Sequence, residues 1–438
     1  MKIIYTLILL LMHTFLFAQT PKIALQKDLT DEALLDLVQK QTFRYFWDFA
    51  HPVSGLSRER SNTTFGYGDE VVTTGGTGFG VMSIIVATER KWIEREEAVT
   101  RLSKMVNFLF KAPCYHGVLP HWMDGATGKT IAFSRKDDGG DLVETAYLMQ
   151  GLLCARQYFK GENKAEQELR QHITWFWEEV EWNWHTAGSS NQLYWHWSPN
   201  NGWAMNYELR GWNECLITYV LAPSSPRYPI QPDVYHKCWA QSDHFKNGKE
   251  YYGIKMPLGF EYGGPLFFAH YSFLGIDPHG LTDNYADYWE QNLNQTRINY
   301  VHCVKNPKGF KGYGADCWGL TASDNHEGYN AHSPDNDLGV ITPTAALSSF
   351  PYTPKESMQA LRHFYYGLGD KIWSEYGFVD AFNEDKNWYA TSHLAIDQGP
   401  IIVMIENHRT GLLWKLFMNV PEIQVGMKKL GFKSPYFK

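Results

Sequence analysis

One pattern recurs along the chain and restricts the folds open to it. A short stretch of glycine and polar residues repeatedly runs into an apolar segment rich in small residues. These segments begin at Thr73, Asp137, Glu208, Tyr262, Tyr313 and His393. A helix that is apolar all round is buried in a globular protein, so the six segments predict six inner helices.

More polar, amphipathic segments lie between the apolar ones. Examples begin at Asp31, Arg95 and Ala165, and each has one polar face suited to the outside of the molecule. Inner helices alternating with outer ones predict an all-α fold, an (α/α)6 barrel or toroid, formed by one domain with loop insertions over residues 19–438. An irregular all-α fold is the alternative. We expect strands only in loop hairpins near 115–135 and 183–205.

The predicted barrel has a consequence for the position of a site. Its inner helices would all point their N-termini toward one end, where the positive ends of the helix dipoles and free N–H groups gather. Polar residues that precede these helices should therefore converge on one cleft.

Aromatic residues make up 16% of the chain, with 17 Trp, 26 Tyr and 25 Phe. Aromatic rings stack on the C–H faces of sugars as well as on one another, so this composition is typical of glycan binding or of a heavily aromatic core. The net charge of −7 provides no basic face for nucleic acid, and we expect no nucleic-acid partner.

The first 18 residues, "MKIIYTLILLLMHTFLFA", have the lysine, apolar stretch and final alanine of a secretory signal peptide. The first cysteine is Cys114, so no lipid-anchor cysteine follows the cleavage point. We expect a periplasmic or secreted protein with no membrane association after signal cleavage. Disulfides are allowed in such a compartment, but a core of this size does not need them, so the pairing of the six cysteines stays open.

Four carboxylates crowd the segment "DDGGDLVETAY": Asp137, Asp138, Asp141 and Glu144. Asp141 and Glu144 have the spacing of a capping box, in which each side chain accepts a backbone N–H of the other residue. Asp138 precedes two glycines and should lie on an exposed, closely approachable turn. Because carboxylates accept hydrogen bonds from sugar hydroxyls, we expect at least one of the four to bind substrate.

Glu214 lies between Trp212 and a run of apolar residues in "GWNECLITYVLA". It is either a first-turn glutamate favoured by the helix dipole or a general acid. A general acid needs burial beside apolar groups to stay protonated near neutral pH, and Trp212 and Cys215 would supply that burial. The helix dipole acts in the opposite sense, so desolvation would have to outweigh it.

Asp397, in "AIDQGP", stands near the start of another predicted inner helix, because Pro400 belongs in a first turn. The residue is either an N-cap or a functional carboxylate. A carboxylate at a helix N-terminus stays ionised, which suits a base or an electrostatic stabiliser.

Two further stretches hold candidate substrate-binding residues. "PHWMDG" contains His121 and Trp122, and the long polar stretch "GLTASDNHEGYNAHSP" contains Asp324, His326, Glu327 and Tyr329. The second stretch is typical of a cleft loop. Its histidines match no standard metal-ligand spacing, and the chain has no nucleotide-binding motif, so we expect no metal and no cofactor.

The stretches "GLTASD", "GVITPTAALSSFPYTP", "FVDAFN" and "IDQGPIIVMIENHRTGLLW" resemble the glucoamylase-like proteins of glycoside hydrolase family 144. Their characterised activity is the hydrolysis of β-1,2-glucans. The resemblance starts at "QKQTFRYFWDF" and covers nearly the whole mature chain. It implies an (α/α)6 barrel, an exported enzyme, no metal and an inverting mechanism.

Residue by residue, the resemblance assigns roles to the motifs. "DLVET" implies that Asp141 and Glu144, with Asp137 or Asp138 upstream, are essential to the cleft. "GWNE" implies Glu214 as general acid, and "IDQGP" implies Asp397 as the base-side carboxylate. Trp122 or Trp212 would stack on a sugar ring.

The resulting prediction is an exported, monomeric, inverting hydrolase that cleaves β-1,2-glucan to short sophoro-oligosaccharides. Inversion requires an acid at the glycosidic oxygen and a base that activates water on the opposite face of the ring. The choice between endo and exo action stays open, because the loops 223–250 and 321–340 do not match the family residue by residue.

Two other classes stay open. One is a polysaccharide lyase or an unsaturated-uronyl hydrolase, since both also use α-barrels; their anionic substrates normally call for basic cleft residues. The other is a non-catalytic glycan-binding protein, which on bacterial surfaces usually carries a lipid-anchor cysteine.

Overall fold

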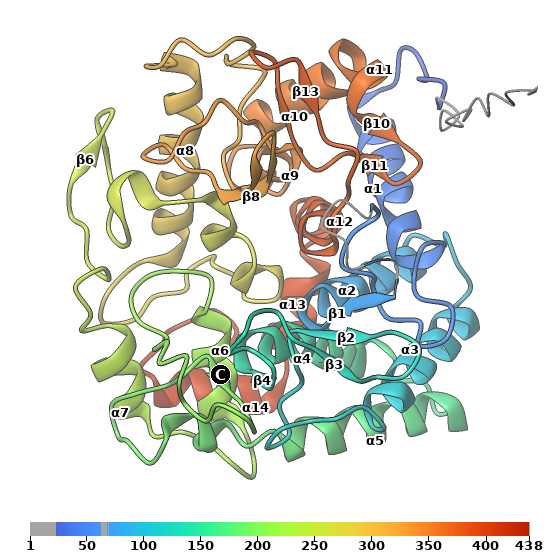
Figure 1. The fold of residues 1–438 in the computed structure, drawn as a ribbon, viewed down its shortest axis with the longest axis vertical. Coiled ribbons are helices and arrows are strands. Elements are labelled where there is room, and N and C mark those ends of the chain that lie inside the picture. The colour runs from blue at the N-terminus through green and yellow to red at the C-terminus, as the bar shows by residue number, and fades with distance from the viewer. Residues whose placement is uncertain (1–22, 63–67, 69, 438) are drawn as a thin grey trace, which may run out of the picture.

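The computed structural model describes residues 23–62, 68 and 70–437 (Figure 1). The expected signal peptide, residues 1–18, lies outside these residues. The described chain is mainly helical, with small antiparallel sheets of two or three strands. The prediction of a helix-dominated fold is therefore confirmed.

The longer α-helices are α1 (Asp31–Trp47), α2 (Thr74–Glu89), α3 (Arg95–Leu109), α4 (Leu142–Tyr158), α5 (Lys164–Glu179), α8 (Tyr288–Lys305) and α12 (Ala395–Thr410). The shorter ones are α6 (Leu216–Ser224), α7 (Pro232–Val234), α9 (Pro343–Leu347), α10 (Pro354–Arg362), α11 (Gly369–Ile372), α13 (Leu412–Met418) and α14 (Pro421–Lys429). Single 3-10 or π turns are η1 (Trp182–Thr186), η2 (Tyr235–Trp239), η3 (Glu261–Gly263), η4 (Leu266–Ala269), η5 (Ser272–Leu274) and η6 (His363–Gly367).

The strands pair locally and antiparallel. One three-stranded sheet consists of β1 (Val71–Thr73), β2 (Trp122–Asp124) and β3 (Thr130–Ile131). The two-stranded pairs are β4 (Gly140–Asp141) with β5 (His196–Trp197), β6 (Glu250–Tyr251) with β7 (Ile254–Lys255), β8 (Ala322–Asn325) with β9 (Gly328–Ala331), β10 (Trp373–Ser374) with β11 (Gly377–Phe378), and β12 (Phe382–Asn383) with β13 (Trp388–Tyr389). Strands were expected near 115–135 and 183–205, and β2, β3 and β5 lie there; the others were not expected.

Four of the six predicted inner segments form buried α-helices: α2, α4, α6 and α12. The other two predictions were wrong. The segment from Tyr262 forms only the short 3-10 turns η3 to η5, because Gly263 and Gly264 have positive φ and Pro265 follows them. The segment from Tyr313 contains no helix; Gly319, at φ +124°, leads it into strand β8.

The predicted outer segments form the amphipathic helices α1, α3 and α5. Helix α1 packs against α12, although the two helices are more than 340 residues apart in the sequence (31 to 47 against 395 to 410). Figure 1 shows the blue start of the described chain beside the orange-red helix α12. An early helix and a late helix of the chain are therefore neighbours.

Helices α2 and α4 make the most extensive contact between elements, and glycines allow it. A Cβ added to Gly78 would lie 2.2 Å from the Tyr147 carbonyl oxygen, and one added to Gly151 would lie 2.2 Å from the Gly78 carbonyl oxygen. The two backbones therefore approach too closely for any side chain at these positions. This contact fixes the N-terminal ends of both helices side by side.

We predict that Gly151→Ala destabilises the fold by about 1–3 kcal/mol, because the added methyl group must push α2 and α4 apart. The control is Gly314→Ala, where a Cβ would come no closer than 3.6 Å to the Asp316 carboxylate. Urea unfolding followed by circular dichroism measures both. Equal stability of the two variants would contradict the account of this helix contact.

The six cysteines are unpaired: Cys114 is exposed and the other five are buried. All six cysteines are therefore free thiols in this structure. Among the described residues, no helix combines the length and apolarity that crossing a membrane requires.

Candidate active site

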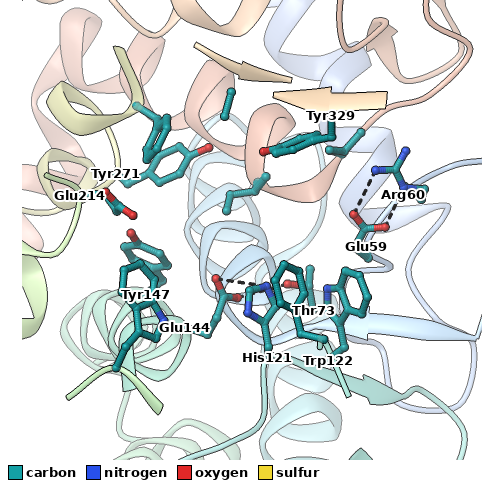
Figure 2. A pocket seen from close by; sticks show the side chains of 16 residues that line it. Glu59, Arg60, Thr73, His121, Trp122, Glu144, Tyr147, Glu214, Tyr271 and Tyr329 are labelled. Carbon is teal, nitrogen blue, oxygen red and sulfur yellow. Dashed lines mark hydrogen bonds and ion pairs between the residues drawn. The ribbon is translucent and has the colours of Figure 1, made fainter. Parts of the chain in front are cut away.

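A cavity of about 450 Å³ opens where the N-terminal ends of the inner helices meet (Figure 2). Thr73 stands at the start of α2, Glu144 in the first turn of α4, Glu214 just before α6, and Leu394 and Ile396 at the start of α12. The predicted convergence on one cleft is confirmed. The remaining lining residues are Glu59, Arg60, His121, Trp122, Phe133, Tyr147, Trp195, Phe267, Tyr271, Ala322 and Tyr329.

Glu144 joins two helix ends. Its carboxylate accepts the backbone N–H of Gly75 at 2.7 Å and the Thr73 hydroxyl at 3.3 Å, both at the start of α2. The expected capping box is therefore only half formed, because this side chain reaches α2 instead of returning to Asp141. Burial, followed by the nearby Asp141 charge, raises the pKa of Glu144 despite the opposing attraction of His121 and these donors.

Asp141 is the N-cap of α4, as predicted. One carboxylate oxygen accepts the N–H groups of Val143 and Glu144 at 3.0 and 2.9 Å, and also the indole N–H of Trp195 at 2.9 Å. Burial opposes its negative charge, but the nearby His196 and His121 and these donors outweigh burial and lower its pKa. Asp141 is therefore an anchored, fully buried anion that does not line the cavity itself.

His121 lies among three carboxylates. Its Nδ1 is 3.0 Å from Asp141 and 4.0 Å from Asp137, and its Nε2 is 3.9 Å from Glu144. Burial works against a charge on this ring, but attraction to Glu144, Asp141 and Asp137 dominates and raises its pKa to about 9. His121 is therefore a cation at neutral pH and the main positive charge beside Glu144.

Strand pairing brings a second histidine to the same cluster. The β4–β5 register sets His196 opposite Asp141, and the His196 Nδ1 lies 3.2 Å from Asp137. His121, Asp137 and Asp141 present ligand atoms within 4.8 Å of one another, as do Cys317, His363 and Glu384 elsewhere. Histidine nitrogens and carboxylate oxygens are suitable ligands for a divalent cation, but ion pairs already join His121 to Asp137 and Asp141.

Glu214 lies two residues before the start of α6 and does not cap that helix. The Ser272 hydroxyl fixes this turn, since it donates to the Glu214 carbonyl at 2.5 Å and accepts the Ile217 N–H at 2.9 Å. Burial, with the charges of Glu144 and Asp141, raises the pKa of the Glu214 carboxyl to about 7, against the pull of its own backbone N–H. Figure 2 shows Glu214 between Tyr271 and Tyr147, with Glu144 farther along the cavity. Desolvation therefore outweighs the helix dipole here.

Asp397, in the first turn of α12, is 1% exposed and makes no capping hydrogen bond. No N–H or hydroxyl group among the described residues donates to either of its carboxyl oxygens. Its neighbour Ile396 lines the cavity, but Asp397 itself does not. The expectation that Asp397 stays fully ionised needs correction, because burial, with the nearby charge of Asp324 adding to it, raises its pKa to about 7.

Arg60, which was not predicted from the sequence, also lines the cavity. Its positive charge is neutralised by two carboxylates, Glu59 and Asp324. Its guanidinium lies 2.9 Å from Glu59 and 2.9 Å from Asp324. Asp324, on β8, also accepts the Ser392 hydroxyl at 2.5 Å. Asp324 is therefore a buried partner of Arg60 rather than a side chain that reaches into the cavity.

Aromatic rings form much of the cavity wall. Phe133 stacks on His121 with ring centroids 4.0 Å apart and packs edge-on against Trp122 at 4.8 Å. The β1–β2 register, which sets Trp122 opposite Thr73, holds this group at the start of α2. Tyr329, on the β8–β9 hairpin, borders the cavity from the other side. These rings offer flat apolar faces of the kind that pack on sugars.

Seven predicted binding residues are outside the cavity lining: Asp137, Asp141 and Asp324, described above, and Trp212, Asp138, His326 and Glu327. Trp212 is fully buried against Phe273 and Tyr288 and has no face for a sugar. Asp138 does not stand free on an exposed turn, because Ser198, Asn200 and Asn201 all donate to it. His326 and Glu327 form the β8–β9 turn, 3.8 Å apart and outside the cavity lining.

Some lining residues had a sequence signal that was not used. Tyr147 follows Glu144 by three residues, the spacing that places two side chains on one helix face. Phe133, Trp195 and Tyr271 come from irregular segments with no periodicity, so only the fold brings them together.

Comparison with known proteins assigns the chain to a family. The family described as putative glucoamylase matches residues 206–421. A putative glucoamylase from Bacteroides uniformis ATCC 8492 is 60% identical, with a TM-score of 0.92 over 94% of this chain and 100% of that one. An endo-β-1,2-glucanase from Chitinophaga pinensis, solved with sophorotriose and glucose, is 54% identical, with a TM-score of 0.91 over 93% of this chain and 100% of that one.

A curated relative from Parabacteroides distasonis, an exo β-1,2-glucooligosaccharide sophorohydrolase, is 48% identical over 423 residues. The match covers 92% of this chain, but the chain spans only 58% of that relative's length. The chain belongs to this family of glucoamylase-like proteins, glycoside hydrolase family 144, as the motifs indicated.

We predict that protonated His121 stabilises the folded state. Its folded pKa of about 9 lies above the ordinary 6.5, so the contribution is fully present below pH 6.5 and is lost as the pH rises through about 9. The free energy of unfolding should exceed that of His121→Gln by up to about 3 kcal/mol at pH 6, and the difference should shrink above pH 9. A difference that does not change with pH would contradict the assigned charge.

Proposed function

We propose that this protein is an exported glycoside hydrolase that cleaves β-1,2-glucan to short sophoro-oligosaccharides with inversion. The support comes from the family, from the two relatives named for action on β-1,2-linked glucose chains, and from the cavity. The two relatives differ in being exo- and endo-acting, so the family alone does not decide between these modes.

The observation that carries the proposal is the position and protonation state of Glu214 in the cavity wall. A carboxyl group in the cavity wall with a pKa of about 7 keeps its proton near neutral pH. Such a group can donate that proton to a glycosidic oxygen, which is the role of the general acid in glycoside hydrolysis. A helix cap or a surface glutamate would not keep the proton.

In the proposed mechanism, Glu214 protonates the glycosidic oxygen while Asp397 removes a proton from water. Because Asp397 does not line the cavity itself, it acts through a second water or a substrate hydroxyl. Glu144 and cationic His121 hold sugar hydroxyls around the scissile bond, buried Asp141 holds His121 in place, and Trp122 packs on a ring. Two carboxyl groups suffice for this chemistry, so no cofactor is required.

The charge of the cavity favours a neutral glycan over the anionic substrates of lyases and uronyl hydrolases. Glu59 and Glu144 line it. Its two cations are already paired, Arg60 with Glu59 and Asp324, and His121 with Asp141. A non-catalytic binding protein would have no use for a protonated Glu214. Both observations support the hydrolase.

Several finer points belong to the same proposal. The meeting of α1 with α12 and the convergence of inner helix ends support an (α/α)6 toroid. The N-terminal sequence supports export to the periplasm or the medium, with no membrane association after cleavage. We propose that the protein acts as a monomer, since one chain supplies both proposed catalytic residues, Glu214 and Asp397.

We predict that Glu214→Gln keeps the fold and loses about 10²–10⁴-fold in kcat on β-1,2-glucan, because the amide has nearly the same shape but cannot donate the proton. Release of reducing sugar and the midpoint of thermal unfolding are the two measurements. The matched control is Glu208→Gln, in the same segment but bonded to Gln192 and outside the cavity; it should keep its activity. A Glu214→Gln variant with normal kcat would refute the assignment.

A further inference from the structure

One tyrosine hydroxyl at the cavity wall has no partner within the protein. Tyr147 lines the cavity and is 2% exposed. Its hydroxyl is buried, and no group among the described residues makes a hydrogen bond with it. In the part of the chain that the structure describes, it is the only tyrosine hydroxyl in this state. A buried hydroxyl without a partner destabilises a folded protein, which points to a function for this one.

Other buried tyrosines show what a structural hydroxyl does. Tyr352 donates to the Ala269 carbonyl at 3.1 Å and accepts the Asn292 amide at 3.1 Å. Tyr219 donates to a backbone carbonyl at 2.7 Å. Neither of these two tyrosines lines the cavity. Tyr147 differs from both, because it lines the cavity and lacks such a bond.

Packing fixes the ring of Tyr147. Its centroid lies 5.3 Å from that of Phe79 on α2 and 5.8 Å from that of Tyr271, which it meets edge-on. A Cβ added to Gly75 would lie 2.8 Å from the Tyr147 Cδ2 atom, so the ring packs directly against the start of α2. The hydroxyl therefore cannot turn to a different partner unless this packing is disturbed.

The hydroxyl lies among the proposed catalytic and binding groups. Tyr147 follows Glu144 by three residues, which puts both side chains on one face of α4. Figure 2 shows its hydroxyl directed toward Glu214. Burial, followed by the nearby charge of Glu214, raises the pKa of Tyr147 well above its usual range, so the hydroxyl keeps its proton. A sugar whose glycosidic oxygen lies at Glu214 would have its neighbouring hydroxyls beside Tyr147.

We propose that Tyr147 is a substrate-binding residue: its hydroxyl makes a hydrogen bond with a sugar hydroxyl next to the glycosidic bond that Glu214 protonates. This inference rests on the proposed function. A sugar hydroxyl both donates and accepts, so it is a suitable partner for a tyrosine hydroxyl. Because this bond lies beside the reacting oxygen, it aligns that oxygen with the Glu214 proton.

The test is Tyr147→Phe, which removes the hydroxyl and keeps the ring. Its kcat/KM on β-1,2-glucan should fall about ten-fold or more, because the sugar hydroxyl then enters a buried site without a partner. Its midpoint of thermal unfolding should be unchanged or higher, because phenylalanine removes a buried polar group that has no partner in the protein. A purely structural role predicts the reverse, a lower midpoint with normal activity.

The matched control is Tyr352→Phe, a buried tyrosine outside the cavity with two hydrogen-bond partners. Its midpoint of thermal unfolding should fall by about 2 °C or more, because the Ala269 carbonyl and the Asn292 amide lose their partner. Its kcat/KM should be unchanged. The two variants therefore have opposite expected effects on stability and on activity.

With a wild type that cleaves β-1,2-glucan, two results would overturn the proposal. One is a Tyr147→Phe variant with the kcat/KM of the wild type, and the other is a midpoint lowered as far as in Tyr352→Phe. If the wild type releases no sugar from β-1,2-glucan, the proposed function fails and this inference fails with it. Turnover by the wild type thus tests the function, and the ratio of the two kcat/KM values tests the role of Tyr147.

Discussion

The burial of carboxyl groups at the N-terminal ends of the inner helices is the constraint on which the site depends. Close contact of α2 with α4, made possible by Gly78 and Gly151, brings the Gly75 N–H within 2.7 Å of Glu144. That arrangement removes Glu144 and Asp141 from water beside His121. A buried carboxyl group is stable only if it accepts hydrogen bonds, pairs with a cation or carries a proton. The acids of this site differ in which of these applies, and they therefore have different chemical roles.

The balance between burial and hydrogen-bond donors determines which of these acids is ionised near neutral pH. Asp141 has backbone, indole and histidine donors, which outweigh burial and keep it ionised. Glu214 and Asp397 occupy comparable helix ends but lack such donors, so burial prevails and both have a pKa of about 7. The helix dipole contributes about 1 kcal/mol or less at most exposed sites, which is less than the desolvation of a buried acid. Position at a helix N-terminus therefore does not by itself fix the protonation of a carboxyl group.

The sequence predicted what depends on periodicity and motif. The apolar segments correctly located α2, α4, α6 and α12, and the expected convergence of their N-termini located Glu144 and Glu214 in one cavity. The prediction of inner helices failed where backbone geometry prevents an apolar segment from forming a helix, as at Gly263 and Gly264, which have positive φ. Trp212 was misplaced because its burial comes from η5 and α8, which are remote in the chain. Arg60 was missed because its partner Asp324 is also distant in the sequence, and only the folded chain brings these two charges together.

The central claim is that Glu214 acts as acid and Asp397 as base on opposite faces of the sugar ring. An inverting pair leaves room for water, with carboxyl groups roughly 6.5–9.5 Å apart, whereas a retaining pair lies about 5–5.5 Å apart and forms a covalent intermediate. Proton NMR of β-1,2-glucan during early turnover tests this most directly, since it records the anomeric form before mutarotation. The account predicts that the first product is the α-anomer. A β-anomeric first product would mean retention and would contradict the role given to Asp397.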